Sequence, residues 1–231
     1  MTSPQCPLDV FKRPGVAGEN QFARHCFSAG IVWIGHLYKR EADAELGHLA
    51  SEGYIDTVQT TDSDIFLFRA PTVIYVPQKK TDGPNITIYT SEDLFTNPSI
   101  SLTRGGMLLI ALLCGGDYDE GITGCGLESA HAVAQGDLGD ALLHEALCNT
   151  TLTNGFLEFV LSWKERLCLE FAEDPRGLLG RKCKAIAATI AQSPSFPDPA
   201  VIFAYVHPIT SWSPGYSLPD HHSWGLARPN L

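Results

Sequence analysis

Three acidic clusters, far apart in the chain, constrain its fold more than any other feature of the sequence. They are Glu41-Ala42-Asp43, Asp62-Ser63-Asp64 and Asp117, which lies in the segment Cys-Gly-Gly-Asp-Tyr over 114–118. Carboxylates repel one another, so a fold that gathers about five of them loses free energy unless hard cations lie between them. The clusters therefore favour a fold that places these segments around one divalent metal site.

The first half of the chain alternates short apolar runs with an amphipathic stretch. Residues 41–52 predict a helix. Residues 79–84 predict a turn that joins the last two predicted strands into a hairpin. This order is typical of an α/β sheet, whose ligands bind beyond the carboxyl ends of its strands. The predicted strands are residues 31–34, 56–61, 72–76 and 86–89.

Helical periodicity dominates the second half. We expect an irregular lead-in over 1–27, an α/β region over 28–120, a helical region over 121–211 and a tail over 212–231. The predicted helices are residues 103–114, 127–135, 138–148, 153–172, 179–192 and 198–206.

Each acidic cluster also has an ordinary structural explanation. Asp62 and Asp64 are common turn residues, although both would point the same way if the chain were still extended there. Glu41 and Asp43 lie at a helix start, where the helix dipole favours acids. Asp117 would serve as a cap for the segment that follows it. All three explanations must hold at once for the metal site to be absent, which favours the metal site.

A glycine-rich turn follows the third cluster, with Gly121, Gly124 and Gly126 at its corners. Glycines free the backbone N–H groups to face a phosphate, and the helix that follows adds its N-terminal dipole. A tight connection between two helices without a ligand explains the same residues equally well. The densest basic stretch includes Arg181 and Lys182, which either contact nucleic acid or form a solvated helix face.

The composition limits the partners of the chain. Its 231 residues carry a formal net charge of −10, which argues against broad electrostatic binding of nucleic acid but leaves room for local binding beside bound cations. No long apolar run and no signal pattern are present, so we expect an intracellular protein without a membrane segment. Its 7 cysteines include no Cys-x-x-Cys pair, so neither a zinc site nor a disulfide framework is indicated.

Taken together, the acidic motifs resemble the XPG/flap-endonuclease family of structure-specific nucleases. Residues 41–44 read Glu-Ala-Asp-Ala, where the family has a Glu-Ala-Glu-Ala helix start. Residues 60–64 read Thr-Thr-Asp-Ser-Asp and match the family's Thr-x-Asp-Ser-Asp strand end. Residues 112–118 match its Leu-Leu-x-Gly-Gly-Asp-Tyr segment, and 121–130 are similar to its helix–two-turn–helix element. The similarity runs over about 25–211 and is closest to fungal relatives of the Holliday-junction-resolving branch.

The resemblance implies a fold and a chemistry. The fold is a PIN-like α/β nuclease core with a partial, mainly parallel sheet, followed by an α-helical helix–two-turn–helix domain. The function is hydrolysis of phosphodiesters at flaps or branched junctions in DNA repair or recombination, in the nucleus, with two Mg²⁺ ions that activate water. The implied metal ligands are Glu41, Asp43, Asp62, Asp64 and Asp117. The implied DNA contacts are Gly121, Gly124, Gly126, Arg181 and Lys182, with a potassium ion at the turn.

The sequence also departs from the family pattern. The family's amino-terminal half, which supplies further aspartate ligands and basic residues, has no counterpart in the 40 residues before Glu41. The Ala-Pro-Gly that usually precedes the acidic helix is replaced by residues 38–40, Tyr-Lys-Arg, and an expected glycine is Arg69. We therefore expect either a fragment, short form or diverged member of such an endonuclease, or a catalytically inactive DNA-binding or scaffold relative.

A third alternative is an unrelated metal enzyme that uses Asp62 and Asp64, such as a nucleotide-sugar transferase or a phosphatase. The phosphatase pattern requires threonine two residues after the second aspartate, and Phe66 stands there.

Overall fold

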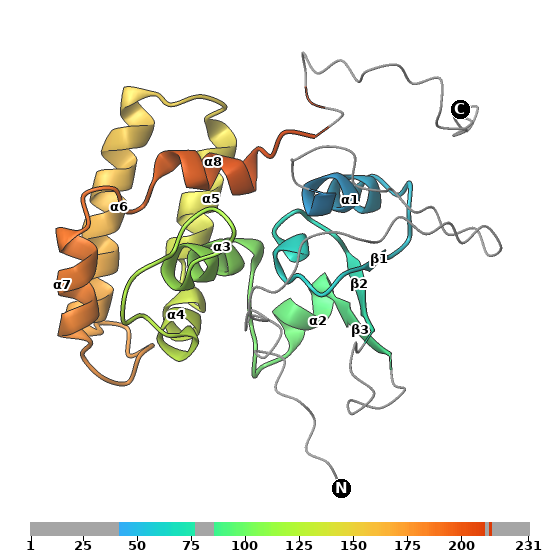
Figure 1. Cartoon of the computed structure of the whole chain (residues 1–231). Helices are drawn as coiled ribbons and strands as arrows, with labels where there is room; N and C mark the ends of the chain where they lie inside the picture. Colours follow the sequence, from blue (N-terminus) through green and yellow to red (C-terminus); the bar gives the residue numbers. More distant parts are fainter. Residues whose placement is uncertain (1–41, 77–85, 211–212, 214–231) are drawn as a thin grey trace, which may run out of the picture.

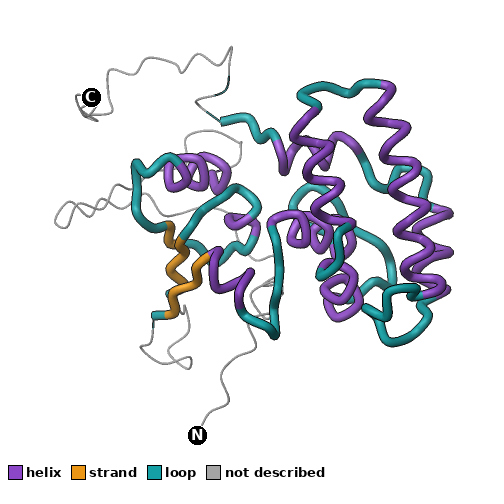
Figure 2. Tube along the Cα trace, turned by 180° about the vertical axis from the view of Figure 1, so that it is seen from behind, coloured by secondary structure: helices purple, strands orange, loops and turns teal. Residues whose placement is uncertain are grey.

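The computed structural model describes residues 42–76, 86–210 and 213, which form two lobes (Figure 1). One lobe holds a small sheet and the other is made of helices. The view from behind shows that the described strands all lie in the first lobe (Figure 2). The first lobe contains α1 (Ala42–Ser51), β1 (Val58–Gln59), the 3₁₀ helix η2 (Asp64–Phe66), β2 (Thr72–Tyr75), β3 (Thr87–Thr90) and α2 (Ser91–Thr96). The second contains α3 (Arg104–Cys114), α4 (Leu127–Ala134), α5 (Leu138–Cys148), α6 (Asn154–Glu173), α7 (Lys184–Gln192) and α8 (Pro199–Val206).

The described strands form a sheet in the order β1-β2-β3. β1 and β2 pair in parallel, with Val58 opposite Val73. β2 and β3 pair antiparallel, with Val73 opposite Tyr89, which confirms the predicted hairpin. The α/β class is thus confirmed, with one parallel and one antiparallel pairing among these strands. The predicted strand over 31–34 and the predicted turn over 79–84 lie outside the described residues.

Most predicted helices are confirmed to within two residues, but two differences have local causes. The helix predicted over 179–192 begins only at Lys184, because Gly180 adopts a left-handed conformation with φ +64° that interrupts a right-handed helix. Helix α2 was not predicted. It is a short helix whose start is capped by Thr90, which accepts a hydrogen bond from the amide of Asp93.

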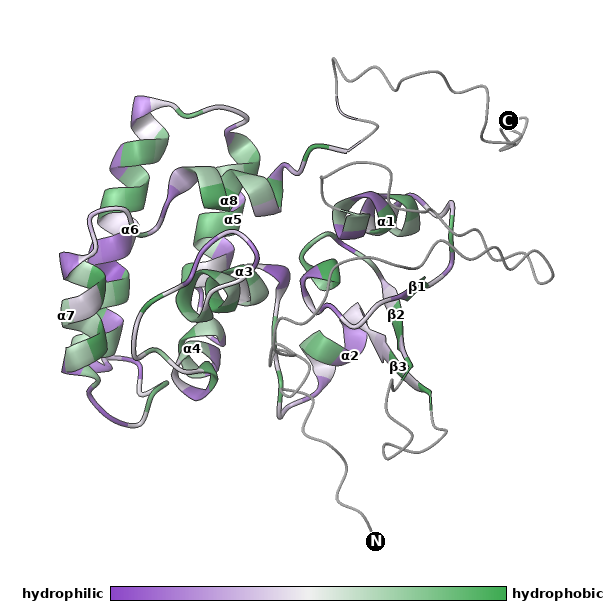
Figure 3. Ribbon diagram, in the orientation of Figure 1, coloured by the Kyte–Doolittle hydropathy of each residue, from purple (hydrophilic) through white to green (hydrophobic). Residues whose placement is uncertain are grey.

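Helix α3 lies at the centre of the molecule. Its residues from Gly105 to Leu113 are all buried, and Figure 3 shows hydrophobic residues along α3 and along α8. α3 packs against α4 and α5 in the helical lobe and also contacts η2 in the sheet lobe. At the α3–α5 crossing, a Cβ on Gly139 would lie 2.2 Å from the carbonyl oxygen of Gly105, so the two backbones meet directly. One hydrophobic core therefore runs through both lobes.

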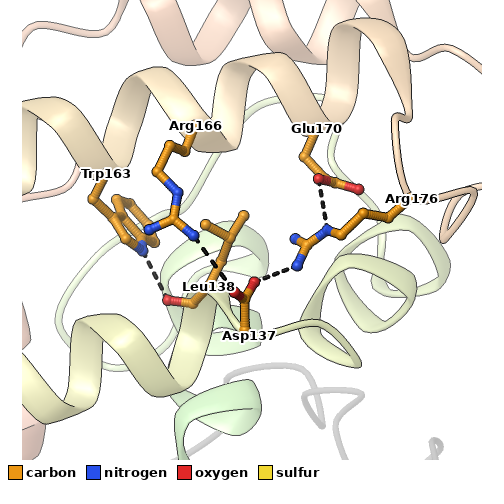
Figure 4. Close-up of polar contacts among 6 residues, drawn as sticks. All are labelled: Asp137, Leu138, Trp163, Arg166, Glu170 and Arg176. Carbon is orange, nitrogen blue, oxygen red and sulfur yellow. Dashed lines mark hydrogen bonds and ion pairs between the residues drawn. The ribbon is translucent and has the colours of Figure 1, made fainter.

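Polar contacts join α5 and α6 to the loop after α6 (Figure 4). The indole Nε1 of Trp163 donates to the carbonyl of Leu138 at 2.8 Å, and Arg176 Nε donates to buried Glu170 at 3.0 Å. Arg176 also bonds Asp137, and this hydrogen bond is the main cause that lowers the pKa of that carboxyl. Since Asp137 is exposed, this pair contributes at most about 1 kcal/mol, and the buried Trp163 contact matters more.

The described residues contain no helix that combines the length and the hydrophobicity needed to cross a bilayer.

Candidate metal and nucleic-acid site

Asp62 and Asp64 lie where the chain leaves β1 and turns into η2. The amide of Asp62 donates to Thr60 Oγ1 at 3.1 Å, and the amide of Asp64 donates to Asp62 Oδ1 at 2.9 Å. Asp62 thus closes a turn with its own side chain, in the manner typical of aspartate. The chain is not extended here, so the alternating geometry of a strand does not orient the two carboxylates. This corrects the sequence-based argument that an extended backbone would point both the same way.

The core holds this turn in place. Ile65 and Phe66 of η2 are 0% and 3% exposed, so burial anchors the residues directly after Asp64. Helix α1, which carries Asp43 in its first turn, packs on the same segment: a Cβ on Gly47 would lie 2.3 Å from the carbonyl oxygen of Phe68. Glu41, the remaining member of the first cluster, lies outside the described residues.

Asp117 follows the end of α3 in a tight turn. Gly115 ends the helix with φ +84°, which favours glycine, and the amide of Gly116 donates to the carbonyl of Asp119 at 2.9 Å. A Cβ on Gly116 would lie 3.4 Å from Asp64 Oδ2, so the turn that carries Asp117 lies against Asp64. The second and third acidic clusters therefore meet in space.

Tyr205 of α8 lies where these two clusters meet. Its ring is 1% exposed, and its hydroxyl donates to Asp64 Oδ2 at 3.1 Å. Burial raises the pKa of the Tyr205 phenol, and the charges of Asp64 and Asp117 raise it further. Both carboxylates are therefore close enough to disfavour a phenolate, and the phenol remains a neutral donor.

Sequence reasoning did not identify Tyr205. The only signal was one hydroxyl-bearing residue among the apolar residues of helix 199–206, and that signal is too weak to mark a site. Tyr118, which follows Asp117, meets the Tyr205 ring edge to face, with ring centroids 4.7 Å apart.

The described residues bring together part of the implied ligand set. Tyr205 donates to Asp64 and is also influenced by the charge of Asp117, and Asp62 accepts a hydrogen bond from the amide of Asp64. Within this part of the chain, no three histidine, cysteine or acidic side chains lie at metal-binding spacing. The donors that do meet are carboxylates, a type that suits Mg²⁺ better than soft metals. The chemistry of the donor set therefore fits Mg²⁺.

The glycines of the turn between α3 and α4 differ in role. Gly121 has φ +77°, and a Cβ there would lie 2.3 Å from the amide nitrogen of Gly115, so Gly121 is required by internal packing. Gly124 has φ +85°, and open space lies beside it. Gly126 begins α4 with φ −85° and also faces open space. Neither backbone conformation nor packing requires glycine at position 126.

The predicted basic contacts lie close to this turn. Burial raises the pKa of the Cys125 thiol to about 12, and the neighbouring Cys114 and Cys183 thiols contribute to this shift, so the turn lies near Cys183. Arg181 and Lys182 immediately precede Cys183 and are exposed. Lys182 forms an ion pair with Glu173, which offsets part of its charge.

The fold and these residues define a class: an α/β protein whose acidic turns lie against a helical lobe that contains an exposed glycine turn. Residues 38–117 match the XPG I-region, and the chain is a relative of the XPG/flap-endonuclease nucleases. It is 31% identical over 129 residues to flap endonuclease GEN homolog 1 of Homo sapiens, which covers 53% of this chain and 14% of that protein. It is 38% identical over 133 residues to flap endonuclease GEN-like 1 of Oryza sativa, which covers 56% of this chain and 20% of that protein.

Solved structures agree with this relationship. A eukaryotic junction-resolving enzyme, GEN-1, bound to caesium superposes with a TM-score of 0.62 at 31% identity, covering 75% of this chain and 41% of that one. The Holliday junction-resolving enzyme GEN1 in complex with product DNA and Mg²⁺ superposes with a TM-score of 0.58 at 30% identity, covering 75% and 39%. The chain thus spans less than half the length of each of these relatives.

Proposed function

We propose that this chain is the internal nuclease region, over 28–120, and the helical DNA-binding region, over 121–211, of a Mg²⁺-dependent endonuclease that cleaves flaps or branched junctions in DNA. Such an enzyme would act in DNA repair or recombination in the nucleus. The observation that carries the proposal is that the turn carrying Asp117 lies against Asp64, which belongs to a separate motif, beside the Tyr205 hydroxyl. A relative of similar fold, GEN1, is described with product DNA and Mg²⁺.

In this proposal, one set of residues binds the metal and another set binds DNA. When bound, Mg²⁺ supplies a Lewis acid that activates water and stabilises charge on the phosphodiester. Its proposed ligands, directly or through water, are Glu41, Asp43, Asp62, Asp64 and Asp117. The exposed turn at Gly124 and Gly126 would present backbone N–H groups to a DNA phosphate, with a potassium ion bound at the same turn. Gly121 would support that turn through packing rather than contact DNA itself.

The direct test is cleavage of labelled flap and four-way-junction DNA by the 231-residue chain. We expect cleavage in Mg²⁺, none in EDTA, and recovery when Mg²⁺ is restored, because the metal supplies the chemistry. The Asp62→Ala variant is the matched loss-of-function control. Cleavage that survives both EDTA and this substitution would end the assignment.

The runner-up is a catalytically inactive DNA-binding or scaffold relative. It is favoured by the finding that, among described residues, no three metal-ligating side chains lie at metal-binding spacing. Thermal unfolding with and without Mg²⁺ separates the two, because a ligand that binds only the folded state raises the unfolding temperature. An intact site gives a clear upshift, and an inactive relative gives none while still binding DNA.

Aspartate at Gly126 is expected to weaken DNA binding by about tenfold without destabilising the fold. Position 126 faces open space and begins α4, where aspartate is a good cap, so we expect the free energy of unfolding to change by less than about 0.5 kcal/mol. The new carboxylate would repel a phosphate held at the turn. Affinity for labelled duplex DNA and urea unfolding measure the two effects.

Gly155→Asp is the control for this prediction. It adds the same charge at the start of α6, where a Cβ would meet Thr153 Oγ1 at an ordinary contact distance of 3.9 Å. Position 155 lies at the far end of α6 from Phe171, whose carbonyl accepts the amide of Cys183 beside the turn. Equal weakening by both substitutions would show that net charge, rather than the turn, determines the affinity.

A further inference from the structure

Tyr205 makes a contact that neither its helix nor its motif context requires. It lies on α8, among the buried apolar residues Val201, Ile202 and Val206. Its hydroxyl reaches Asp64 Oδ2 at 3.1 Å, across 141 positions of sequence. A phenylalanine would fill the same space, and burying a hydroxyl costs free energy unless it is hydrogen-bonded. The hydrogen bond to Asp64 therefore accounts for a hydroxyl at this position.

The Tyr205 ring is held by residues that follow both acidic clusters. Phe68, shortly after Asp64, stacks on it with centroids 6.3 Å apart. Tyr118, directly after Asp117, meets it edge to face at 4.7 Å. The position of the Tyr205 ring is thus set by the two segments that carry Asp64 and Asp117.

Gly116 shows how closely the hydroxyl approaches the turn of Asp117. A Cβ on Gly116 would lie 1.9 Å from the Tyr205 hydroxyl and 3.2 Å from its Cζ. φ at Gly116 is not in the left-handed region, so backbone conformation does not require glycine there. The hydroxyl itself occupies the space that a side chain would need.

We propose that Tyr205 is a positioning residue: its hydroxyl orients the Asp64 carboxylate and fits against Gly116, so that α8 of the helical lobe sets the spacing between Asp64 and Asp117. This inference rests on the proposed metal-dependent function. A hydrogen-bond donor behind a ligating carboxylate holds that carboxylate in its binding orientation, as partners of metal ligands generally do. The helical lobe is thereby part of the metal site rather than only a surface for DNA.

The test is Mn²⁺ binding by the 231-residue chain, measured by calorimetry, with Tyr205→Phe as the main variant. We expect the affinity to fall about tenfold, because the carboxylate loses the donor that orients it. The ring is kept, so the unfolding temperature in EDTA falls by no more than a few degrees. Tyr54→Phe is the control, since it removes the hydroxyl of a tyrosine that is 56% exposed, and it should bind Mn²⁺ as the wild type does.

A second substitution makes the test independent of one variant. Gly116→Ala displaces the hydroxyl and should also weaken Mn²⁺ binding about tenfold. In the Tyr205→Phe background, the ring atom nearest to the added Cβ is Cζ, at 3.2 Å. The alanine should therefore cause little further loss of Mn²⁺ affinity. Losses that simply multiply in the double variant would overturn the positioning role.

The outcomes separate this inference from the proposed function. A wild-type chain without saturable Mn²⁺ binding overturns both. Saturable binding that is lost in Asp64→Ala but unchanged in Tyr205→Phe leaves the proposed function standing and overturns the role of Tyr205.

Discussion

Alanine at Asp64 is expected to lower Mg²⁺-dependent cleavage of branched DNA by at least about a hundredfold, because a metal ion contributes several kcal/mol to such reactions. The substitution removes a proposed ligand. It also removes the acceptor of the Tyr205 hydroxyl, which lies 3.1 Å from Asp64 Oδ2. Both effects act on the same site. Asp117 would lose the neighbouring carboxylate, and the Tyr205 hydroxyl would lose its hydrogen-bond acceptor.

Single-turnover cleavage of a labelled junction measures this effect, since it follows chemistry rather than product release. Asp64→Asn separates charge from hydrogen bonding: its side-chain oxygen can still accept from Tyr205, but the negative charge is lost. We expect Asn to fold like the wild type and to cleave as poorly as Ala. Asp56→Ala, an exposed carboxylate on the same lobe, is the control. A comparable loss in the control would argue against a specific role for Asp64.

Alanine at Trp163 is expected to lower the free energy of unfolding by about 3–5 kcal/mol. Trp163 is 0% exposed and is among the largest fully buried side chains of the described residues. Its removal creates a cavity between α5 and α6 and leaves the carbonyl of Leu138 without the indole donor that lies 2.8 Å away. Because one core runs through both lobes, the loss of the Trp163 side chain should also weaken the packing of α8.

Urea unfolding followed by far-UV circular dichroism measures this loss. Trp163→Phe is the matched variant, since it keeps an aromatic ring and removes the hydrogen bond, and we expect it to cost less than the alanine change. If alanine cost less than about 1 kcal/mol, the packing of α6 on α5 would not be a main source of stability.

Local patterns were sufficient for most of the secondary structure. The apolar period of 153–172 predicted α6, and the β-forming runs 72–76 and 86–89 predicted a hairpin that the structure confirms. The failures were also local. Helix α2 spans only Ser91–Thr96, which is too short to show a helical period, and the start of α7 was displaced by the left-handed Gly180.

The candidate site was predictable from the sequence only in part. Its acidic residues stand in motifs that the sequence displays, and the XPG I-region over 38–117 contains them. Their orientation did not follow from the motifs, because Asp62 folds back to bond the amide of Asp64 instead of continuing a strand. The assignment of Glu41, Asp43, Asp62, Asp64 and Asp117 as metal ligands stays a prediction.

The sequence by itself determined most of the helices, the hairpin and the identity of the acidic turns, since each depends on residues close together in the chain. Only the tertiary structure decided that Tyr205 meets Asp64 beside Gly116, across 141 positions. Such a contact depends on how α8 packs against the rest of the core, and no local periodicity encodes the direction from which a distant helix arrives.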